Sequence, residues 1–343
     1  LFGQLLHWKL NMELPKVSIM IPTYNQQQYI VRAVESAMSQ DYENLEIIIS
    51  DDCSADDTQT VVRTFIAESG DSRIKYFRNP DNIGILRNYR KTLCDYVEGD
   101  WVINLDGDDF FIDPKFISTA IRLVREDTGI VLVFGNYCEY YQKTSKTIEI
   151  LNKALPRVME ANDFLLRYSN DGIIWNHSSI LYKRKNAMQL GFYWDEMVPR
   201  NDWESFLRLI INNRVGFIEN ISAAWVQHES NETNRIDIKK YLNNFVLIKG
   251  ICLFASNNGV DEDLIHEFSK NMFYSCTRDS SIAYIRKNDF KGLALFLSHA
   301  YKEDWLLPMK VISNPGVIVR TFLSFSPSLY TTVKKFYRKL PLH

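Results

Sequence analysis

The stretch Trp101-Val-Ile-Asn-Leu-Asp-Gly-Asp-Asp109 joins a strand-like run to an acidic turn. Residues 101–105 are mostly apolar and β-favouring, which predicts a buried strand. Three carboxylates follow within four residues, and like charges this close raise one another's pKa and repel. A hard divalent cation such as Mg²⁺ or Mn²⁺ best compensates the repulsion between these carboxylates, and it leaves coordination positions open for phosphate oxygens. The alternative is a solvated acidic turn that caps the next helix.

Outward from this stretch, strand-like runs alternate with helix-like stripes. The predicted strands are 17–21, 45–49, 74–77, 101–105 and 130–134, and the predicted helical segments are 30–38, 54–66, 84–97 and 117–124. In segment 30–38, for example, apolar residues recur at the spacing of one helix face. Strict alternation predicts an α/β fold, with a mostly parallel sheet and helices on both faces.

Polar clusters follow three of the predicted strands, at Pro22–Asn25, Asp51-Asp52 and Asp106–Asp109. Ligands bind beyond the carboxyl ends of the strands in such sheets, so we expect these clusters to share one crevice. Asp51 or Asp52 could accept the imino N–H of a uracil or thymine ring, or a ribose hydroxyl. The alternative for either carboxylate is capping of the next helix.

The alternation of strands and helices ends near residue 140. Residues 141–160 resemble a loop or hairpin, 161–228 mix short helices and strands, and residues from 236 onward are helical in pattern. We therefore expect an N-terminal extension at 1–13, a catalytic domain at 14–235 and a helical C-terminal region at 236–343.

Composition excludes several classes of protein. The 343 residues carry a formal net charge of −2, which gives no general electrostatic attraction to nucleic acid. Five scattered cysteines predict free thiols in a reducing, cytoplasmic compartment, and we see no apolar run long enough to cross a bilayer. The basic and amphipathic C-terminal region fits peripheral contact with the inner face of a membrane, or a helical cap on the catalytic domain.

Three motifs in order resemble glycosyltransferase family 2. They are VSIMIPTYN at 17–25, IIISDDCSADDT at 47–58 and LDGDDF at 105–110. The resemblance covers about residues 16–230 and implies the GT-A fold, with a Rossmann-like nucleotide-binding sheet. It also implies an inverting enzyme that uses a nucleotide-diphosphate sugar, with a UDP-sugar favoured, and Mn²⁺ or Mg²⁺.

The same resemblance assigns roles to individual residues. Nucleotide-sugar binding is implied for Pro22, Thr23, Tyr24, Asn25, Asp51, Asp52, Asn82, Gly84, Arg87, Asp106 and Gly107. Metal binding is implied for Asp106, Asp108, Asp109 and His228. Asp202, in a segment similar to the family's Glu-Asp-Trp, would be the catalytic base, although Asn201 stands where Glu is usual. The alternative for Asp202 is a helix N-cap.

The acceptor site is expected near Trp175 and His177, where Trp175 could stack on a sugar ring or belong to the core. We expect a saccharide or lipid-linked saccharide as acceptor, in bacterial surface polysaccharide synthesis. The rival functions are a non-catalytic nucleotide-sugar-binding protein and a nucleotidyltransferase. The second would need a Gly-rich, basic phosphate loop after the first strand, and Pro22–Asn25 is neither.

Overall fold

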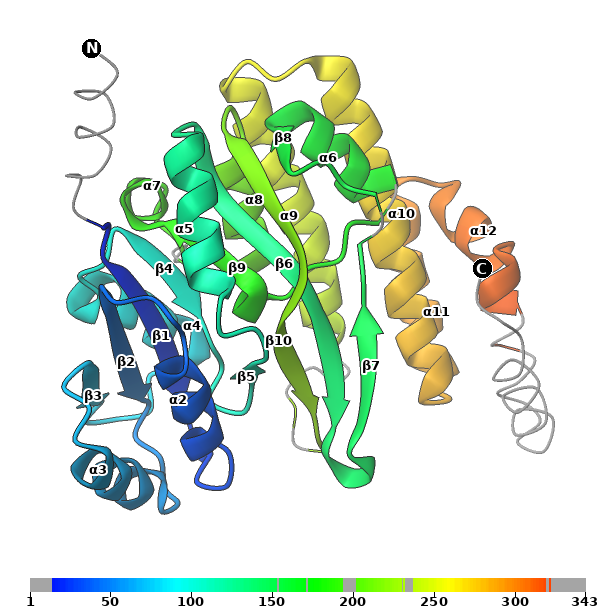
Figure 1. The fold of residues 1–343 in the computed structure, drawn as a ribbon. Coiled ribbons are helices and arrows are strands. Elements are labelled where there is room, and N and C mark those ends of the chain that lie inside the picture. Colours follow the sequence, from blue (N-terminus) through cyan, green and yellow to red (C-terminus); the bar gives the residue numbers. More distant parts are fainter. Residues whose placement is uncertain are drawn as a thin grey trace, which may run out of the picture. The chain divides into compact units, whose positions relative to one another are not determined.

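A computed structural model describes residues 14–152, 154–170, 172–193, 202–229, 231, 237–318 and 321 (Figure 1). The chain divides into two compact units between His228 and Glu229. The expected boundary near 235 falls among residues 232–236, outside the described residues, so it stays a prediction. The expected N-terminal extension, 1–13, also lies outside them.

The first unit begins with the predicted alternation of strands and helices. The elements are β1 (Val17–Thr23), α2 (Ile30–Met38), β2 (Leu45–Asp51), α3 (Thr58–Ser69), β3 (Ile74–Arg78), α4 (Ile85–Lys91), the π-helical turn Thr92–Tyr96 and β4 (Trp101–Asn104). These strands pair in parallel in the order β3-β2-β1-β4. Their carboxyl ends therefore point to the same edge of the sheet.

The second half of this unit makes the sheet mixed. Its elements are β5 (Phe110–Phe111), α5 (Phe116–Glu126), β6 (Ile130–Tyr141), β7 (Lys146–Ile150), β8 (Val158–Glu160), α6 (Ala161–Asn170), the 3₁₀ turn η3 (His177–Ser179), β9 (Ile180–Lys183), α7 (Arg184–Gln189), α8 (Asp202–Ile210) and β10 (Arg214–Gln227). β9 lies between β4 and β6 and is antiparallel to both, whereas β10 is parallel to β6. β6 runs beyond the predicted 130–134 because it forms a hairpin with β7 and pairs along its length with β10.

A hydrophobic core fixes the parallel half of the sheet. The apolar stripe predicted for α2, including Ile30 and Val34, is buried against one face of β1, β2 and β4, from which Ile19, Ile47 and Ile103 project. The apolar face of α5 joins the same cluster. Each buried Val or Ile side chain contributes about 1.5–3 kcal/mol relative to exposure, so the strands are held firmly and their ends form a rigid edge.

The second unit consists of helices in its described part, as expected. They are α9 (Ile238–Asn257), α10 (Glu262–Arg286), α11 (Phe290–Glu303) and α12 (Leu307–Ile312). The carboxylate of Asp261 accepts hydrogen bonds from the N–H groups of Asp263 and Leu264 and so caps α10. Among the residues described, no helix has both the length and the apolarity needed to cross a membrane.

Candidate active site

Two of the predicted polar clusters and the acidic turn meet at one corner of the sheet. Thr23 stands opposite Asp51 in the β1–β2 register, and the N–H of Asp52 donates to the carbonyl of Thr23 at 2.9 Å. A Cβ atom on Gly107 would lie 2.8 Å from Thr23 Oγ1, so the acidic turn approaches β1 too closely for any other residue to fit undisturbed. The three polar clusters predicted at strand ends therefore lie close together at one edge of the sheet.

The corner after β1 exposes one aromatic ring. Pro22 and Thr23 are buried, whereas the side chain of Tyr24 is 47% exposed. Asn25 has a positive φ of 53° and ties this corner to the next loop, because its N–H donates to Ser54 Oγ at 2.9 Å. Of these four residues, Tyr24 and Asn25 are exposed, and the contacts of all four with a nucleotide stay predictions.

Asp51 is fully buried at the end of β2. Its Oδ1 accepts the N–H of Ser54 at 2.8 Å, and its Oδ2 accepts the hydroxyl of Tyr76 at 2.6 Å. Burial, followed by this hydrogen bond to Asp51, raises the pKa of Tyr76. Asp51 thus ties down the loop after β2. It does not cap the next helix, because α3 begins at Thr58 with Asp57 at its N-cap position, and the contact of Asp51 with a base stays a prediction.

Asp52 organises the predicted nucleotide loop at residues 82–84. Its Oδ1 accepts the N–H of Ile83 at 2.9 Å, and its Oδ2 accepts the N–H of Gly84 at 2.8 Å. Gly84 has a φ of +86°, which favours glycine. Asn82 and Arg87 are exposed on the same segment, so Asp52 positions them, and their contacts with a nucleotide stay predictions.

The acidic turn distributes its three carboxylates in different directions. Asp106 Oδ2 lies 3.0 Å from His177 Nε2, and Asp108 Oδ2 lies 2.9 Å from His228 Nε2. Asp109 is only 1% exposed. The sequence predicted His228 near these aspartates but assigned His177 to the acceptor.

The pKa values at the turn reflect burial and crowding of charge. Burial, together with the charges of Asp108 and Asp106, raises the pKa of Asp109 well above its ordinary value. Burial alone would raise the pKa of Asp106 as well, but the nearby charge of His177 holds it below its ordinary value. A cation at the turn would favour the ionised form of both carboxylates.

Asp106, Asp109 and His177 form a group that fits a divalent cation. One ligand atom from each residue lies within 4.8 Å of the others. Carboxylate oxygens and an imidazole nitrogen are ligands that suit Mn²⁺ and related ions. Asp108 and His228, also predicted as ligands, pair with each other beside this group.

Asp202 and His177 lie next to each other beside the acidic turn. Asp202 is the first residue of α8, its side chain is 41% exposed, and its Oδ2 lies 3.2 Å from His177 Nδ1. The pKa of His177 is raised well above its ordinary value: burial alone would lower it, but the charges of Asp106 and Asp202 outweigh burial. The imidazole therefore lies between two carboxylates, one near each ring nitrogen.

Trp175 belongs largely to an aromatic cluster. Its ring centroid lies between 5.3 and 6.0 Å from those of Phe134, Phe164, Tyr168 and Phe206. The indole is half-buried. This agrees with the core alternative, and stacking of Trp175 on an acceptor stays a prediction.

Two side chains that the sequence analysis missed donate hydrogen bonds to carboxylates of the acidic turn. The hydroxyl of Tyr89 donates to Asp106 Oδ1, and the hydroxyl of Ser178 donates to Asp109 Oδ2 at 3.0 Å. Tyr89 is buried in α4. It follows the Arg87-Asn88 pair directly, and this place beside a predicted nucleotide contact is the sequence signal that could have found it.

Two further missed residues lie on or beside α2. Arg32 Nη2 donates to the carbonyl of Asp108 at 3.1 Å, and its guanidinium lies 4.4 Å from the centroid of the Phe110 ring. The ring of Tyr29 stacks on His228 at 4.8 Å. No sequence signal distinguishes Tyr29 and Arg32 from ordinary polar residues beside an apolar stripe.

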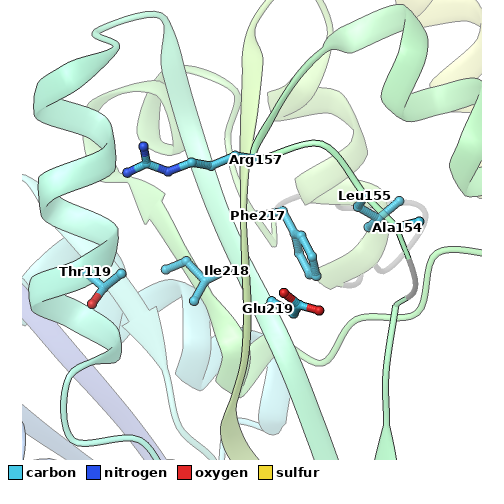
Figure 2. Close-up of a pocket in the computed structure, with 7 residues that line it drawn as sticks. All are labelled: Thr119, Ala154, Leu155, Arg157, Phe217, Ile218 and Glu219. Carbon is cyan, nitrogen blue, oxygen red and sulfur yellow. The ribbon is translucent and has the colours of Figure 1, made fainter.

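A separate hollow of about 380 Å³ lies between α5 and β10 (Figure 2). Phe217, Ile218 and Arg157 are among its lining residues. None of the residues predicted for the site, all of which the structure describes, lines this hollow. The candidate active site is therefore the edge that carries the acidic turn.

Comparison with known proteins agrees with this geometry. The Glycosyl transferase family 2 model matches residues 18–186. A Campylobacter jejuni GalNAc(5)-diNAcBac-PP-undecaprenol beta-1,3-glucosyltransferase is 35% identical over 155 residues, 45% of this chain and 48% of that protein. The Escherichia coli UDP-Glc:alpha-D-GlcNAc-diphosphoundecaprenol beta-1,3-glucosyltransferase WfaP is 30% identical over 194 residues, 57% of this chain and 70% of that protein. The chain thus spans about half the length of the Campylobacter relative and more of WfaP.

Solved structures show the same fold. Residues 1–349 of S. aureus TarS superpose with a TM-score of 0.58 at 15% identity, covering 84% of this chain and 91% of that one. The Pyrobaculum calidifontis mannosyltransferase PcManGT, in complex with GDP-Man and Mn²⁺, gives a TM-score of 0.56 at 15% identity over 95% of this chain and 96% of that one. The predicted GT-A fold with a helical C-terminal region is confirmed. The chain belongs to glycosyltransferase family 2 and is a glycosyltransferase.

Proposed function

We propose that the protein is an inverting, metal-dependent enzyme of bacterial surface polysaccharide synthesis. It moves a sugar from a nucleotide diphosphate, with UDP favoured, to a hydroxyl of a saccharide carried on a lipid. The observation that carries this proposal is the placement of Asp202 and Asp106 on the two sides of one imidazole, at 3.2 and 3.0 Å. Asp202, the proposed base for the acceptor hydroxyl, is thus close to Asp106, a proposed ligand of the cation that meets the donor diphosphate.

The names of similar proteins support the choice of substrates. Both glucosyltransferases compared above are named for acceptors linked to undecaprenol through a diphosphate, and the name of WfaP specifies UDP-Glc as donor. A crystal structure of TarS holds UDP-GlcNAc, and the structure of PcManGT is a complex with GDP-Man and Mn²⁺. We propose Mn²⁺ or Mg²⁺ for this chain, held by Asp106 and Asp109 with Asp108 and His228 beside them.

In the proposed reaction, Asp202 accepts the proton of the acceptor hydroxyl as that oxygen bonds to the anomeric carbon. The bond from the anomeric carbon to the diphosphate breaks, and its electron pair leaves on the diphosphate. A bound divalent cation would neutralise the charge that develops there. A positioned base contributes about 10²–10⁴-fold to the rate. Attack opposite the leaving group inverts the anomeric configuration.

The test is transfer from a UDP-sugar to a polyprenyl-diphosphate-linked saccharide in the presence of Mn²⁺. We expect UDP release, a lengthened acceptor and, by NMR of the product, the anomeric configuration opposite to that of the donor. Asp202→Asn should keep the Kd for UDP and lose most turnover, whereas the exposed control Asp279→Asn should keep both. Retention of configuration, or a wild-type rate in Asp202→Asn, would refute the proposal.

We also propose that the enzyme works at the cytoplasmic face of an anionic membrane. All five cysteines are free thiols, which supports a reducing compartment. Trp305, Met309 and Ile312 are more than half exposed at i, i+4 and i+7, while Leu307 and Val311 on the opposite side of α12 are buried. An apolar stripe that contains tryptophan suits the interface of a bilayer.

The charge beyond this stripe complements anionic lipid. After Asp304 no Asp or Glu occurs through His343, and the cations in that stretch are Lys310, Arg320, Lys334, Lys335, Arg338 and Lys339. Each cation near an anionic surface contributes about 1 kcal/mol. A lipid-linked acceptor would require the enzyme to reach such a surface.

Flotation with vesicles tests the membrane proposal separately from catalysis. The protein should float with anionic but not with neutral vesicles, and the serine triple variant of Trp305, Met309 and Ile312 should float at least tenfold less. Serine substitutions of Val246 and Leu253, two exposed residues of α9, serve as the control. The triple variant should still transfer sugar to a water-soluble acceptor at the wild-type rate. The membrane proposal would be overturned if the protein did not float and its mass in solution rose with concentration, because the stripe would then join two copies of the chain.

A further inference from the structure

His177 is fixed in place by the turn that carries it. It begins the 3₁₀ turn η3, and the side chain of Asn176 before it accepts the N–H of Ser178 at 2.8 Å. Ser178 is fully buried, and its hydroxyl donates to Asp109 Oδ2. The imidazole is itself only 17% exposed. The side chain of His177 is therefore restricted to few rotamers, and its two ring nitrogens point in defined directions.

Each ring nitrogen of His177 faces a different carboxylate. Nε2 lies 3.0 Å from Asp106 Oδ2, and Nδ1 lies 3.2 Å from Asp202 Oδ2. We infer that His177 is a positioning residue that orients the base Asp202 against the donor side of the site. This inference rests on the proposed function, because it takes Asp202 as the base.

The physical reason is that Asp202 cannot orient itself. Its side chain is 41% exposed at the start of a helix, and a carboxylate in that position can rotate. An N–H···O bond from Nδ1 to Oδ2 restricts this rotation and assigns proton transfer to Oδ1. Because Nε2 lies 3.0 Å from Asp106 Oδ2 at the same time, the orientation of the proposed base is set relative to the carboxylate proposed to meet the donor. A displacement of about 1 Å can cost about 10²-fold in rate.

A competing role for His177 is that of a cation ligand, since it belongs to the group that fits a divalent ion. Two substitutions separate these roles because asparagine and glutamine each keep one of the ring's two donors. His177→Asn places an N–H near the position of Nδ1 and can still reach Asp202. His177→Gln places an N–H near the position of Nε2 and can still reach Asp106.

The experiment compares kcat, acceptor KM and the Kd for UDP in the presence of Mn²⁺ for wild type, His177→Asn and His177→Gln. A positioning role predicts that His177→Gln lowers kcat by about 10–100-fold, while His177→Asn stays within about fivefold of wild type. The Kd for UDP should change less than about threefold in both variants. Adding His177→Gln to Asp202→Asn should cause no further loss of kcat, because the positioned group is already absent.

The outcomes distinguish this inference from the proposed function. If Asp202→Asn keeps the wild-type rate, the base assignment and this inference fail together. If Asp202→Asn is impaired but His177→Asn and His177→Gln have equal kcat, only the positioning role fails. A loss of more than tenfold in Mn²⁺-dependent UDP affinity in both His177 variants would make His177 a cation ligand and overturn the positioning role.

Discussion

Replacing Glu46 by glutamine should remove a pH-dependent contribution to the stability of the parallel half of the sheet. Glu46 lies near the start of β2, and its side chain is 3% exposed. Its Oε1 accepts the hydroxyl of Ser18 at 2.5 Å, and its Oε2 lies 2.9 Å from Lys16 Nζ and 3.0 Å from Lys75 Nζ. Burial opposes its ionisation, but the hydrogen bonds and the two lysines outweigh burial and lower the pKa of Glu46 from 4.5 to about 2.

The sign and size of the effect follow from that pKa. A carboxyl group whose pKa is lower in the folded state stabilises the fold at pH values above its unfolded pKa, and this stability is lost as the pH falls toward 2. The difference between 4.5 and about 2 corresponds to about 3 kcal/mol, at about 1.4 kcal/mol per pH unit. The side chains of Lys16 and Lys75 are 31% and 37% exposed, so solvent screening reduces our expectation to about 2 kcal/mol.

Urea unfolding of wild type and Glu46→Gln, followed by circular dichroism at pH 7 and pH 3, measures this contribution. The free energy of unfolding of wild type should exceed that of Glu46→Gln by about 2 kcal/mol at pH 7 and by less than half of that at pH 3. Glu43→Gln changes an exposed glutamate before β2, and its free energy of unfolding should not differ from that of wild type in a way that depends on pH. An equal loss in the free energy of unfolding for Glu46→Gln at both pH values would refute the reasoning. Activity per folded molecule should not change, because Glu46 lies at the edge of the sheet opposite the site.

Three further predictions concern the site. Asp108→Ala should weaken binding of UDP by about tenfold or more in calorimetry with Mn²⁺ and leave binding without Mn²⁺ unchanged, since Asp108 and His228 adjoin the group that fits a cation. Excess chelator should abolish transfer and added Mn²⁺ should restore it; full catalysis in chelator would reject a metal-dependent mechanism. Trp175→Ala should lower the free energy of unfolding by about 2 kcal/mol, because the half-buried indole packs in an aromatic cluster. Trp175→Phe should recover most of that loss, and a raised acceptor KM in this folded variant would show instead that Trp175 stacks on the acceptor.

The parallel half of the fold was predictable because each of its elements carries a complete local signal. The stripe at Ile30, Ala33, Val34 and Ala37 is buried as its spacing predicted. The short apolar strands before the polar clusters pair in parallel, so their ends had to meet at one edge. The acidic turn could be placed at that edge from sequence order alone.

The antiparallel insertion of β9 could not be predicted in the same way. Residues 180–183 are few, and nothing in their composition specifies that they pair with β4 on one side and β6 on the other. That pairing depends on contacts between residues nearly 80 positions apart, such as Ile103 with Leu181. Tertiary packing decides such a strand, since local β-propensity is weak and depends on context.

This insertion also explains why the sequence separated residues that the structure brings together. Because β9 runs antiparallel to β4, its first residue, not its last, lies at the edge where β4 ends. The turn at His177 precedes β9 directly and is therefore placed beside Asp106, although 71 residues separate them in the sequence. β10 runs parallel to β6, so the residue after its end, His228, arrives at the same edge beside Asp108. The antiparallel strand β9 thus brings His177 to Asp106, and the parallel strand β10 brings His228 to Asp108. The reversed direction of β9 is the reason that one histidine lies between Asp106 and Asp202.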